Sequence, residues 1–338
     1  MFRALAFINP RLTTKNVGDI FIEDSLKRIL VHDLDRSVDI DPRRPITPLE
    51  IDRINACDAA VIVGTNLWYR ELRRPGRWMF TADDLRKIRV PIIPLGVGTS
   101  RRLDEDDGFD ADTLEQLRRI HGSCAIGSAR DPRTAQALAS AGIQNVAMTG
   151  CPTLFRSLSP TWQLAAKPGV SQVVVTTRDG HRSSARLLLR HLRDSGLSPV
   201  IAAQKPRDRI SRSSLPFTGP AAPSIFSFQI EPYLDLVKSS RGSVGRRLHG
   251  NMLHLAHGNP AIFFANNSRA TSFCEAFGLP CISAADGDPI DPARVAEHAS
   301  RLNDPGTFAQ MPERYGLARA EMVRFLEANG LEHRLRPG

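Results

Sequence analysis

The sequence predicts an α/β fold in two units, each built around a parallel sheet. Short apolar runs alternate with segments of helical periodicity, the pattern of parallel strands joined by helices. The 338 residues leave room for two domains. A stretch at 157–169, with two prolines and few periodic apolar residues, separates the halves. We therefore expect an N-terminal domain over 1–156 and a C-terminal domain over 170–338, with the last helix packing back on the first domain as an alternative.

The first half contains a regular alternation of strands and helices. Strands are predicted at 3–8, 37–40, 59–63, 91–95, 124–128 and 145–149. Helices are predicted at 20–30, 48–56, 81–89, 112–120 and 132–141. The run at 59–63 is wholly apolar, which is typical of a parallel strand buried on both faces. Thr81, Asp19 and Asp131 are expected to cap helices, and Pro132 suits the first helical position.

The second half repeats this architecture without repeating the sequence. Strands are predicted at 172–177, 199–203, 261–265 and 282–283, and 243–245 is predicted to be a strand end or a tight turn. Helices are predicted at 183–195, 231–238, 251–257, 271–277, 292–302 and 317–329. The polar, proline-rich stretch 207–223 predicts a mobile surface loop over the ligand cleft.

The composition excludes several classes of protein. The net charge is +9, but arginines supply most of it, acidic residues are interleaved, and aromatics make up only 6%, so nucleic-acid binding is not expected. A diffuse positive field suits an anionic small substrate or acidic lipid headgroups. No run reaches the roughly 18–20 apolar residues of a membrane span. The five cysteines form no CxxC pair, so we expect no metal site, no disulfide framework and a cytoplasmic location.

The most informative stretch is Arg246–Asn251, where a strand is predicted to become a helix. A helix start favours anions, and an arginine fork suits a phosphate or carboxylate. In an extended segment, Arg247 and His249 would point the same way and place an anion beside a general acid or base. The alternative is a surface arginine pair with a histidine that caps the helix.

Other candidate binding residues follow strands of the first half. Asn16, Gly18 and Asp19 lie after the first strand, in a turn that either lines the ligand site or is only a well-formed strand-to-helix connection. Later strands end in Gly64-Thr65-Asn66 and in a turn containing Gly98 and Thr99. None of these turns is a GxGxxG fingerprint or a P-loop, so a dinucleotide or nucleoside triphosphate is not expected.

Arg130 precedes the predicted cap Asp131 and is expected to project into the ligand cleft, with an ion pair to a loop carboxylate as the alternative. Four other histidines have no comparable sequence context and are expected to be structural: His121, His181, His254 and His257.

The ordered set of these motifs resembles the polysaccharide pyruvyl transferase family over roughly residues 5–285. The matching elements are the N-x-G-D turn, the strand ending at Gly64, Gly96-Val97-Gly98, Arg130-Asp131, Ala141–Ile143, the R-L-H-G elbow at Arg247–Gly250, Gly258-Asn259-Pro260, and a helix with Phe273 and Gly278-Leu279. Three places depart from the family: its G-G-G turn is Gly64-Thr65-Asn66, a lysine before the last helix is Arg269, and a D-P pair is Cys151-Pro152.

The resemblance implies two Rossmann-like domains facing a cleft, as in GT-B glycosyltransferases. It implies phosphoenolpyruvate as donor, a sugar diol of a cell-surface polysaccharide or its precursor as acceptor, and a pyruvate ketal as product. No metal or organic cofactor is needed. In the family, the arginines of the R-D and R-L-H elements bind the donor and the histidine is the acid/base, roles that fall on Arg130, Arg247 and His249. Arg269 is a further candidate for the donor's charges.

Two other functions stay open at this stage. One is a GT-B glycosyltransferase that uses a nucleotide sugar, whose diphosphate the elbow would hold. The other is a glycan- or anion-binding protein without turnover. Because glycan acceptors of this kind are often lipid-linked, peripheral association with the inner membrane face is an alternative to a freely diffusing cytoplasmic protein.

Overall fold

The computed structural model describes residues 1–99, 108–177, 182–208, 222–265, 267–283 and 292–335. The chain divides into two compact units. The first comprises Met1–Thr14, Ile22–Thr161 and Tyr315–Gly338, and the second comprises Lys15–Phe21 and Trp162–Arg314. The main boundary lies within the stretch expected to be a linker, and the last residues of the chain belong to the first unit.

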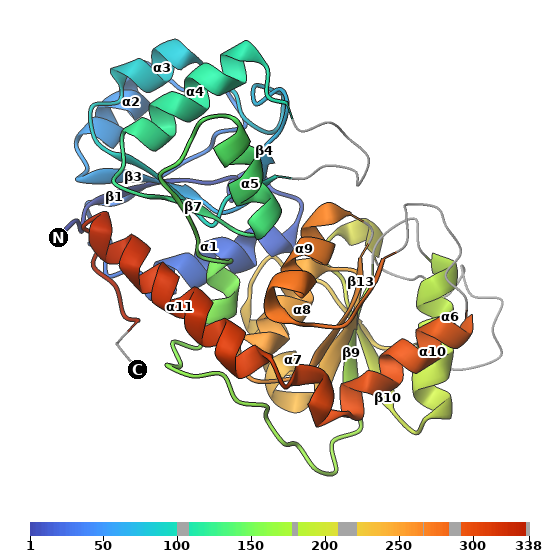
Figure 1. Ribbon diagram of the computed structural model, residues 1–338. Helices are drawn as coiled ribbons and strands as arrows, with labels where there is room; N and C mark the ends of the chain where they lie inside the picture. The colour runs from blue at the N-terminus through green and yellow to red at the C-terminus, as the bar shows by residue number, and fades with distance from the viewer. Residues whose placement is uncertain (100–107, 178–181, 209–221, 266, 284–291, 336–338) are drawn as a thin grey trace. The chain divides into compact units, whose positions relative to one another are not determined.

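The main sheet of the first unit has four parallel strands in the order β2-β1-β3-β5, and two further pairs of strands are β4-β6 and β7-β8. Its strands are β1 (Leu5–Ile8), β2 (Val38–Ile40), β3 (Ala59–Val63), β4 (Asn66–Trp68), β5 (Ile92–Leu95), β6 (Gly98–Thr99), β7 (Gly127–Ala129) and β8 (Val146–Met148). Its helices are α2 (Pro48–Asn55), α3 (Ala82–Lys87), α4 (Ala111–Gly122) and α5 (Pro132–Ser140), with most of α1 (Val17–Ile29) and α11 (Met311–Ala328). Figure 1 shows α2, α3 and α4 over one face of the sheet and α1 over the other.

Local sequence signals explain where two of these helices begin. The Thr81 side chain accepts from the Asp84 N–H at 3.1 Å at the start of α3, and Asp131 accepts from the Thr134 N–H at 2.9 Å at the start of α5. Both caps are those predicted, because a short polar side chain satisfies a backbone N–H that the helix itself cannot pair.

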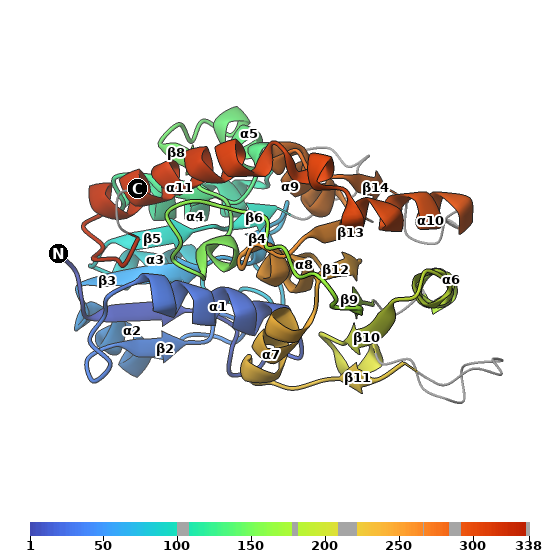
Figure 2. The ribbon, with the colours of Figure 1, turned by 90° about the horizontal axis from the view of Figure 1, so that it is seen from below.

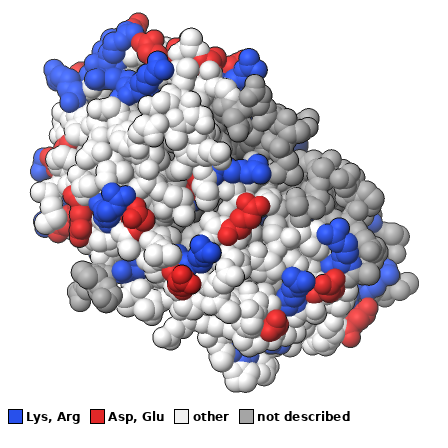
Figure 3. Space-filling model, in the orientation of Figure 1, with Lys and Arg blue, Asp and Glu red and all other residues white. Residues whose placement is uncertain are grey.

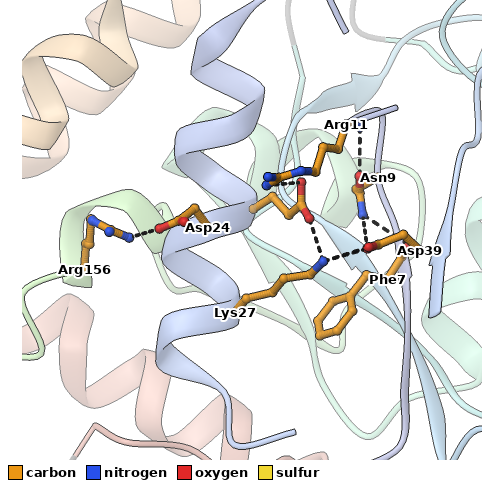
Figure 4. A network of polar contacts seen from close by, with 8 residues as sticks. Phe7, Asn9, Arg11, Asp24, Lys27, Asp39 and Arg156 are labelled. Carbon is orange, nitrogen blue, oxygen red and sulfur yellow. Dashed lines mark hydrogen bonds and ion pairs between the residues drawn. The ribbon is translucent and has the colours of Figure 1, made fainter. Parts of the chain in front are cut away.

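A buried ion-pair network fixes the second half of α1 to the sheet (Figure 4). The Glu23 carboxylate is 1% exposed and lies 2.7 Å from the Lys27 ammonium. Lys27 also bonds Asp39 on β2 at 2.8 Å and lies over the Phe7 ring. Burial raises the pKa of Glu23, and the ion pair with Lys27 opposes that rise. A buried carboxylate needs such partners, so this network specifies how α1 meets β1 and β2.

The second unit holds a six-stranded parallel sheet in the order β11-β10-β9-β12-β13-β14, visible in Figure 2. Its strands are β9 (Gln172–Thr176), β10 (Ser198–Ala202), β11 (Ser224–Ile225), β12 (Gly242–Gly245), β13 (Ala261–Ala265) and β14 (Cys281–Ser283). Its helices are α6 (Arg182–Asp194), α7 (Glu231–Ser239), α8 (Leu248–Leu255), α9 (Ser268–Phe277) and α10 (Pro292–Ser300). Counted within the unit this is the 3-2-1-4-5-6 order of Rossmann folds, which bind ligands where the order reverses, here between β9 and β12.

Several elements begin at other residues than predicted, and the clearest case is the first helix. Helix α1 begins at Val17 rather than near residue 20, so Asp19 lies in its first turn and is not the cap. This early turn forms because Val17 and Phe21 pack into the core of the second unit with Val174 and Tyr233. Strand β7 begins at Gly127 rather than at 124.

The stretch 207–223 lies mostly outside the described residues. At its start, Pro206–Asp208 forms a 3₁₀ turn in which Arg207 is exposed and Asp208 is buried. No helix in the described part of the chain is long and apolar enough to cross a membrane.

Candidate functional site

A strained elbow joins β12 to α8 in the second unit. Gly245 has φ +145, and a Cβ there would lie 2.2 Å from the Thr176 carbonyl oxygen, so only glycine fits. The Arg246 N–H donates to that oxygen at 2.8 Å, and the Arg247 N–H donates to the Thr176 hydroxyl at 3.2 Å. The elbow is therefore held on the end of β9, at the point where the strand order reverses.

The chain turns helical earlier than the sequence predicts. Arg247 has extended backbone and precedes α8, but Leu248 and His249 already belong to the first turn of the helix. The prediction that Arg247 and His249 share one side of an extended segment is therefore wrong. Helix packing decides this, because Leu248, Met252 and Leu253 are all buried and draw the first turn onto the core.

Arg247 is held by a carboxylate that sequence reasoning missed. Its Nε and Nη2 atoms lie 2.8 and 2.5 Å from the two oxygens of Asp208, whose side chain is 0% exposed. Asp208 also accepts from the N–H groups of Gln204 at 3.2 Å and Lys205 at 3.0 Å. The Nε and Nη2 donors of Arg247 are thus both used in the ion pair with buried Asp208. The signal available in the sequence was the turn-forming Pro206 two residues before Asp208.

His249 lies against the turn predicted from the N-terminal motif. It is 5% exposed, and a Cβ on Gly18 would lie 3.2 Å from its Nδ1 atom. The Asn16 amide donates to Asp19 at 3.2 Å within that turn. The turn of Asn16, Gly18 and Asp19 is far from His249 in the sequence. The two nevertheless form one group, because Lys15–Phe21 belongs to the second unit.

Gln204 joins this group and was not predicted from the sequence. Its carbonyl oxygen accepts from the Val17 N–H at 2.9 Å, which docks the N-terminal turn on the end of β10. Arg269 lies in the first turn of α9, after β13, the neighbour of β12 in the sheet. Its helix is capped by Asn267, whose side chain accepts from the Ala270 N–H at 3.2 Å.

The glycine turns of the first unit pack directly on one another. A Cβ on Gly64 would lie 2.6 Å from the Gly96 carbonyl oxygen, so the turn after β3 requires glycine. The Gly98 N–H donates to the Thr65 carbonyl at 2.9 Å, and β4 pairs with β6 through Asn66 and Gly98. The Thr99 N–H donates to the Thr134 hydroxyl at 3.0 Å. These predicted residues thus form a second group.

Arg130 completes the second group from the end of β7. It is 0% exposed, with Nε donating to the Gly96 carbonyl at 3.2 Å and Nη1 to the Asn66 side chain at 3.1 Å. Among the described residues it forms no ion pair, so the alternative of a loop carboxylate is not observed there. Its Nη2 atom is buried with no hydrogen-bond partner in the part of the chain that the structure describes. Among the described residues the guanidinium is therefore bonded by neutral oxygens alone, and its Nη2 donor has no partner there.

Two other histidines are buried in apolar surroundings. Burial lowers the pKa of His121 to about 4 and that of His254 to about 3. Both are therefore neutral at pH 7. Among the described residues no cluster of three or more histidine, cysteine or acidic side chains could hold a metal ion.

Basic side chains gather on one face of the first unit (Figure 3). The exposed ones on or just after α2, α3 and α4 are Arg53, Arg86, Lys87, Arg89, Arg118 and Arg119. Acidic neighbours offset part of the charge, since Arg86 pairs with Asp83 and with Glu115. Folding thus concentrates charge that is dispersed along the sequence.

The sequence profile of polysaccharide pyruvyl transferases matches residues 15–268, three quarters of the chain. The chain belongs to this family. The family is one of transferases, and its sequence profile spans the N-terminal turn, both glycine turns, Arg130, the elbow and the first residue of α9. No curated protein sequence matches the chain.

Solved structures of low sequence identity share the fold. S. aureus MnaA with UDP is 12% identical with a TM-score of 0.54, covering 98% of this chain and 99% of its own. The UDP-GlcNAc 2-epimerase of Neisseria meningitidis, bound to UDP-GlcNAc, is 12% identical with a TM-score of 0.54, covering 95% of this chain and 97% of its own. The UDP-GlcNAc 2-epimerase of Methanocaldococcus jannaschii is 12% identical with a TM-score of 0.53, covering 97% of this chain and 99% of its own. The pyruvyl transferase chain therefore has the GT-B-like fold expected from its sequence.

Proposed function

We propose that this transferase moves the enolpyruvyl group of phosphoenolpyruvate onto a sugar diol of a cell-surface polysaccharide or its precursor, forming a pyruvate ketal. The observation that carries the proposal is the position of His249. It is buried in the first turn of α8, against Gly18, at the reversal point of a Rossmann-type sheet. A titratable imidazole beside the unpaired N–H groups of a helix start suits acid–base chemistry on an anionic substrate.

In the proposed reaction, protonated His249 donates its proton to the methylene carbon of phosphoenolpyruvate, which becomes the methyl group. One sugar hydroxyl attacks the adjacent carbon and phosphate leaves with the electrons of the C–O bond. The second hydroxyl then closes the ketal, His249 accepts one hydroxyl proton, and the other passes to solvent or phosphate. This chemistry needs no metal and no organic cofactor.

The donor carries a phosphate and a carboxylate, so it requires several positioned cations. We assign this role to Arg130, Arg247 and Arg269. Arg130 is the strongest candidate, because its buried Nη2 atom has no partner among the described residues. Arg247 offers a ligand less, because its Nε and Nη2 atoms are bonded to Asp208. Asn16, Gly18, Asp19 and the turns Gly64–Asn66 and Gly98–Thr99 are assigned to substrate binding.

We also propose that the reaction takes place in the cytoplasm, at the inner membrane face where the acceptor is lipid-linked. All five cysteines are free thiols, which suits a reducing compartment.

The test is phosphate release from phosphoenolpyruvate against a panel of sugar acceptors. We expect acceptor-dependent release, and His249→Ala is expected to lower its rate by about 10²–10⁴-fold because a general acid is lost. The matched control is His257→Ala, since His257 is exposed near the end of the same helix and its loss should leave the rate unchanged.

Two results would contradict the proposal. Unchanged turnover in His249→Ala would remove this residue from the mechanism. Absence of phosphate release with every acceptor, together with a nucleotide sugar that raises the melting temperature where phosphoenolpyruvate does not, would favour a glycosyltransferase.

A further inference from the structure

Gln204 is held rigidly at the end of β10. Its N–H donates to the Asp208 carboxylate at 3.2 Å and its carbonyl accepts from the Val17 N–H at 2.9 Å. The residue is 2% exposed. Since both backbone groups are bonded and the side chain is enclosed, the direction of the side chain is fixed before any ligand binds.

The side-chain amide of Gln204 lies between two glycines. A Cβ on Gly18 would lie 3.1 Å from its Oε1 atom, and a Cβ on Gly250 would lie 2.5 Å from its Nε2 atom. The His249 Nδ1 atom lies 3.2 Å from the same Gly18 position. The amide and the imidazole are therefore close neighbours, and a side chain at Gly250 would force the amide to move.

The Nε2 atom of Gln204 is buried and has no hydrogen-bond partner among the described residues. A buried donor without a partner is costly, so proteins rarely keep one unless a ligand or water uses it. This donor lies against Gly250, in the first turn of α8, where the helix itself provides no partners for the first N–H groups. Neutral donors that converge at a helix start form a site for an anionic oxygen.

We propose that Gln204 is a substrate-binding residue whose Nε2 donates a hydrogen bond to an anionic oxygen of the donor, next to His249. The inference rests on the proposed function, since it assigns a further residue to the same site. It also gives Gly250 a role: any larger residue there displaces the amide.

The test is calorimetric titration of the full-length protein with phosphoenolpyruvate and, separately, with UDP. Gln204→Met keeps the size of the side chain and removes the donor, and is expected to weaken phosphoenolpyruvate binding by about 10- to 100-fold, the loss of a hydrogen bond to a charged group. Gln204→Glu keeps an acceptor at Oε1 but replaces Nε2 with a carboxylate oxygen, and is expected to weaken binding at least as much. Gly250→Ala leaves Gln204 in place and displaces its amide, so it should give the same loss even if a substitution at Gln204 unfolds the protein.

The matched control is Gln116→Met on α4. Gln116 is 0% exposed, and both polar atoms of its amide are bonded: Nε2 donates to Asp112 at 2.9 Å and Oε1 accepts from Trp78 at 3.0 Å. This variant should lower the melting temperature without changing the affinity for phosphoenolpyruvate.

Each outcome separates the inference from the proposed function. Equal phosphoenolpyruvate affinity in the wild type, Gln204→Met and Gly250→Ala overturns the role of Gln204 and leaves the donor standing. Binding of UDP but not phosphoenolpyruvate, weakened in Gln204→Met, overturns the proposed donor and supports Gln204 as an anion-binding residue. A wild-type protein that binds neither anion overturns both.

Discussion

Arg130 in the first unit and Arg247 in the second both follow the end of a parallel strand, yet they are held in opposite ways. Arg247 lies on a buried carboxylate, with Nη2 2.5 Å from Asp208. Arg130 is more fully enclosed, at 0% exposed against 14% for the Arg247 side chain, and its described partners are the neutral oxygens of Gly96 and Asn66.

The difference teaches which arginine is free to serve a ligand. A buried charge without a counter-ion is costly, and an arriving anion relieves that cost. Arg247 has Asp208 as a counter-ion within the protein, and this ion pair connects the elbow to the turn that contains Asp208. We therefore infer that Arg130 contributes more to donor binding, and that Arg247 contributes mainly to the shape of the elbow.

The largest expected effect comes from removing the carboxylate. Asp208→Ala leaves the largely buried guanidinium of Arg247 without its partner and is expected to lower the free energy of unfolding by about 3–5 kcal/mol. The matched change in the first unit, Asn66→Ala, removes a neutral partner and should cost only about 1 kcal/mol. Urea unfolding of the two variants measures the contrast.

A double variant isolates the charge itself. Asp208→Leu combined with Arg247→Met removes both members of the pair and should recover most of the stability lost in Asp208→Ala. Equal losses in Asp208→Ala and Asn66→Ala would show that the two arginines are held equivalently.

The next effect concerns pH and compares the buried histidines of the two units. His121 and His254 have pKa values lowered to about 4 and about 3, so they stay neutral in the folded protein while the unfolded chain binds protons below pH 6.5. Stability should therefore fall as the pH drops from 6.5 toward 4, by about 2 kcal/mol for each histidine between pH 7 and pH 5. Urea unfolding at both values, with His121→Leu alongside, tests this: the variant should lose less stability on acidification than the wild type. A wild type equally stable at pH 7 and pH 5 would contradict the burial of neutral histidines.

The smallest effect on stability, and the one that sharpens the comparison most, is expected for Arg130→Met. Removing a buried charge that has no counter-ion among the described residues should offset the two lost hydrogen bonds, so the free energy of unfolding should change by less than about 1 kcal/mol. Phosphoenolpyruvate binding should nevertheless weaken by about 10- to 100-fold, which calorimetry measures. Arg247→Met should do the reverse, costing stability more than affinity. A loss of stability without loss of affinity in Arg130→Met would assign Arg130 a structural role.

Much of the local structure could be predicted because the responsible signals are local. Apolar runs predicted β3 and β13 to the residue, and Thr81 and Asp131 marked two helix starts. The start of α8 could not be predicted, because burial of Leu248 and Met252 in the unit's core decides it. The start of α1 at Val17 depends in the same way on a core formed by residues more than a hundred positions away.

The sequence by itself determined the parallel α/β architecture, the glycine turns, the elbow and its family, because each depends on a few adjacent residues. Only the tertiary structure decided which side chains contact one another in the candidate site. It paired Arg247 with Asp208, left Arg130 among neutral oxygens, and placed Gln204 between Gly18 and Gly250 beside His249. These contacts join distant segments, and their energies depend on burial and distance, which no single stretch of sequence encodes.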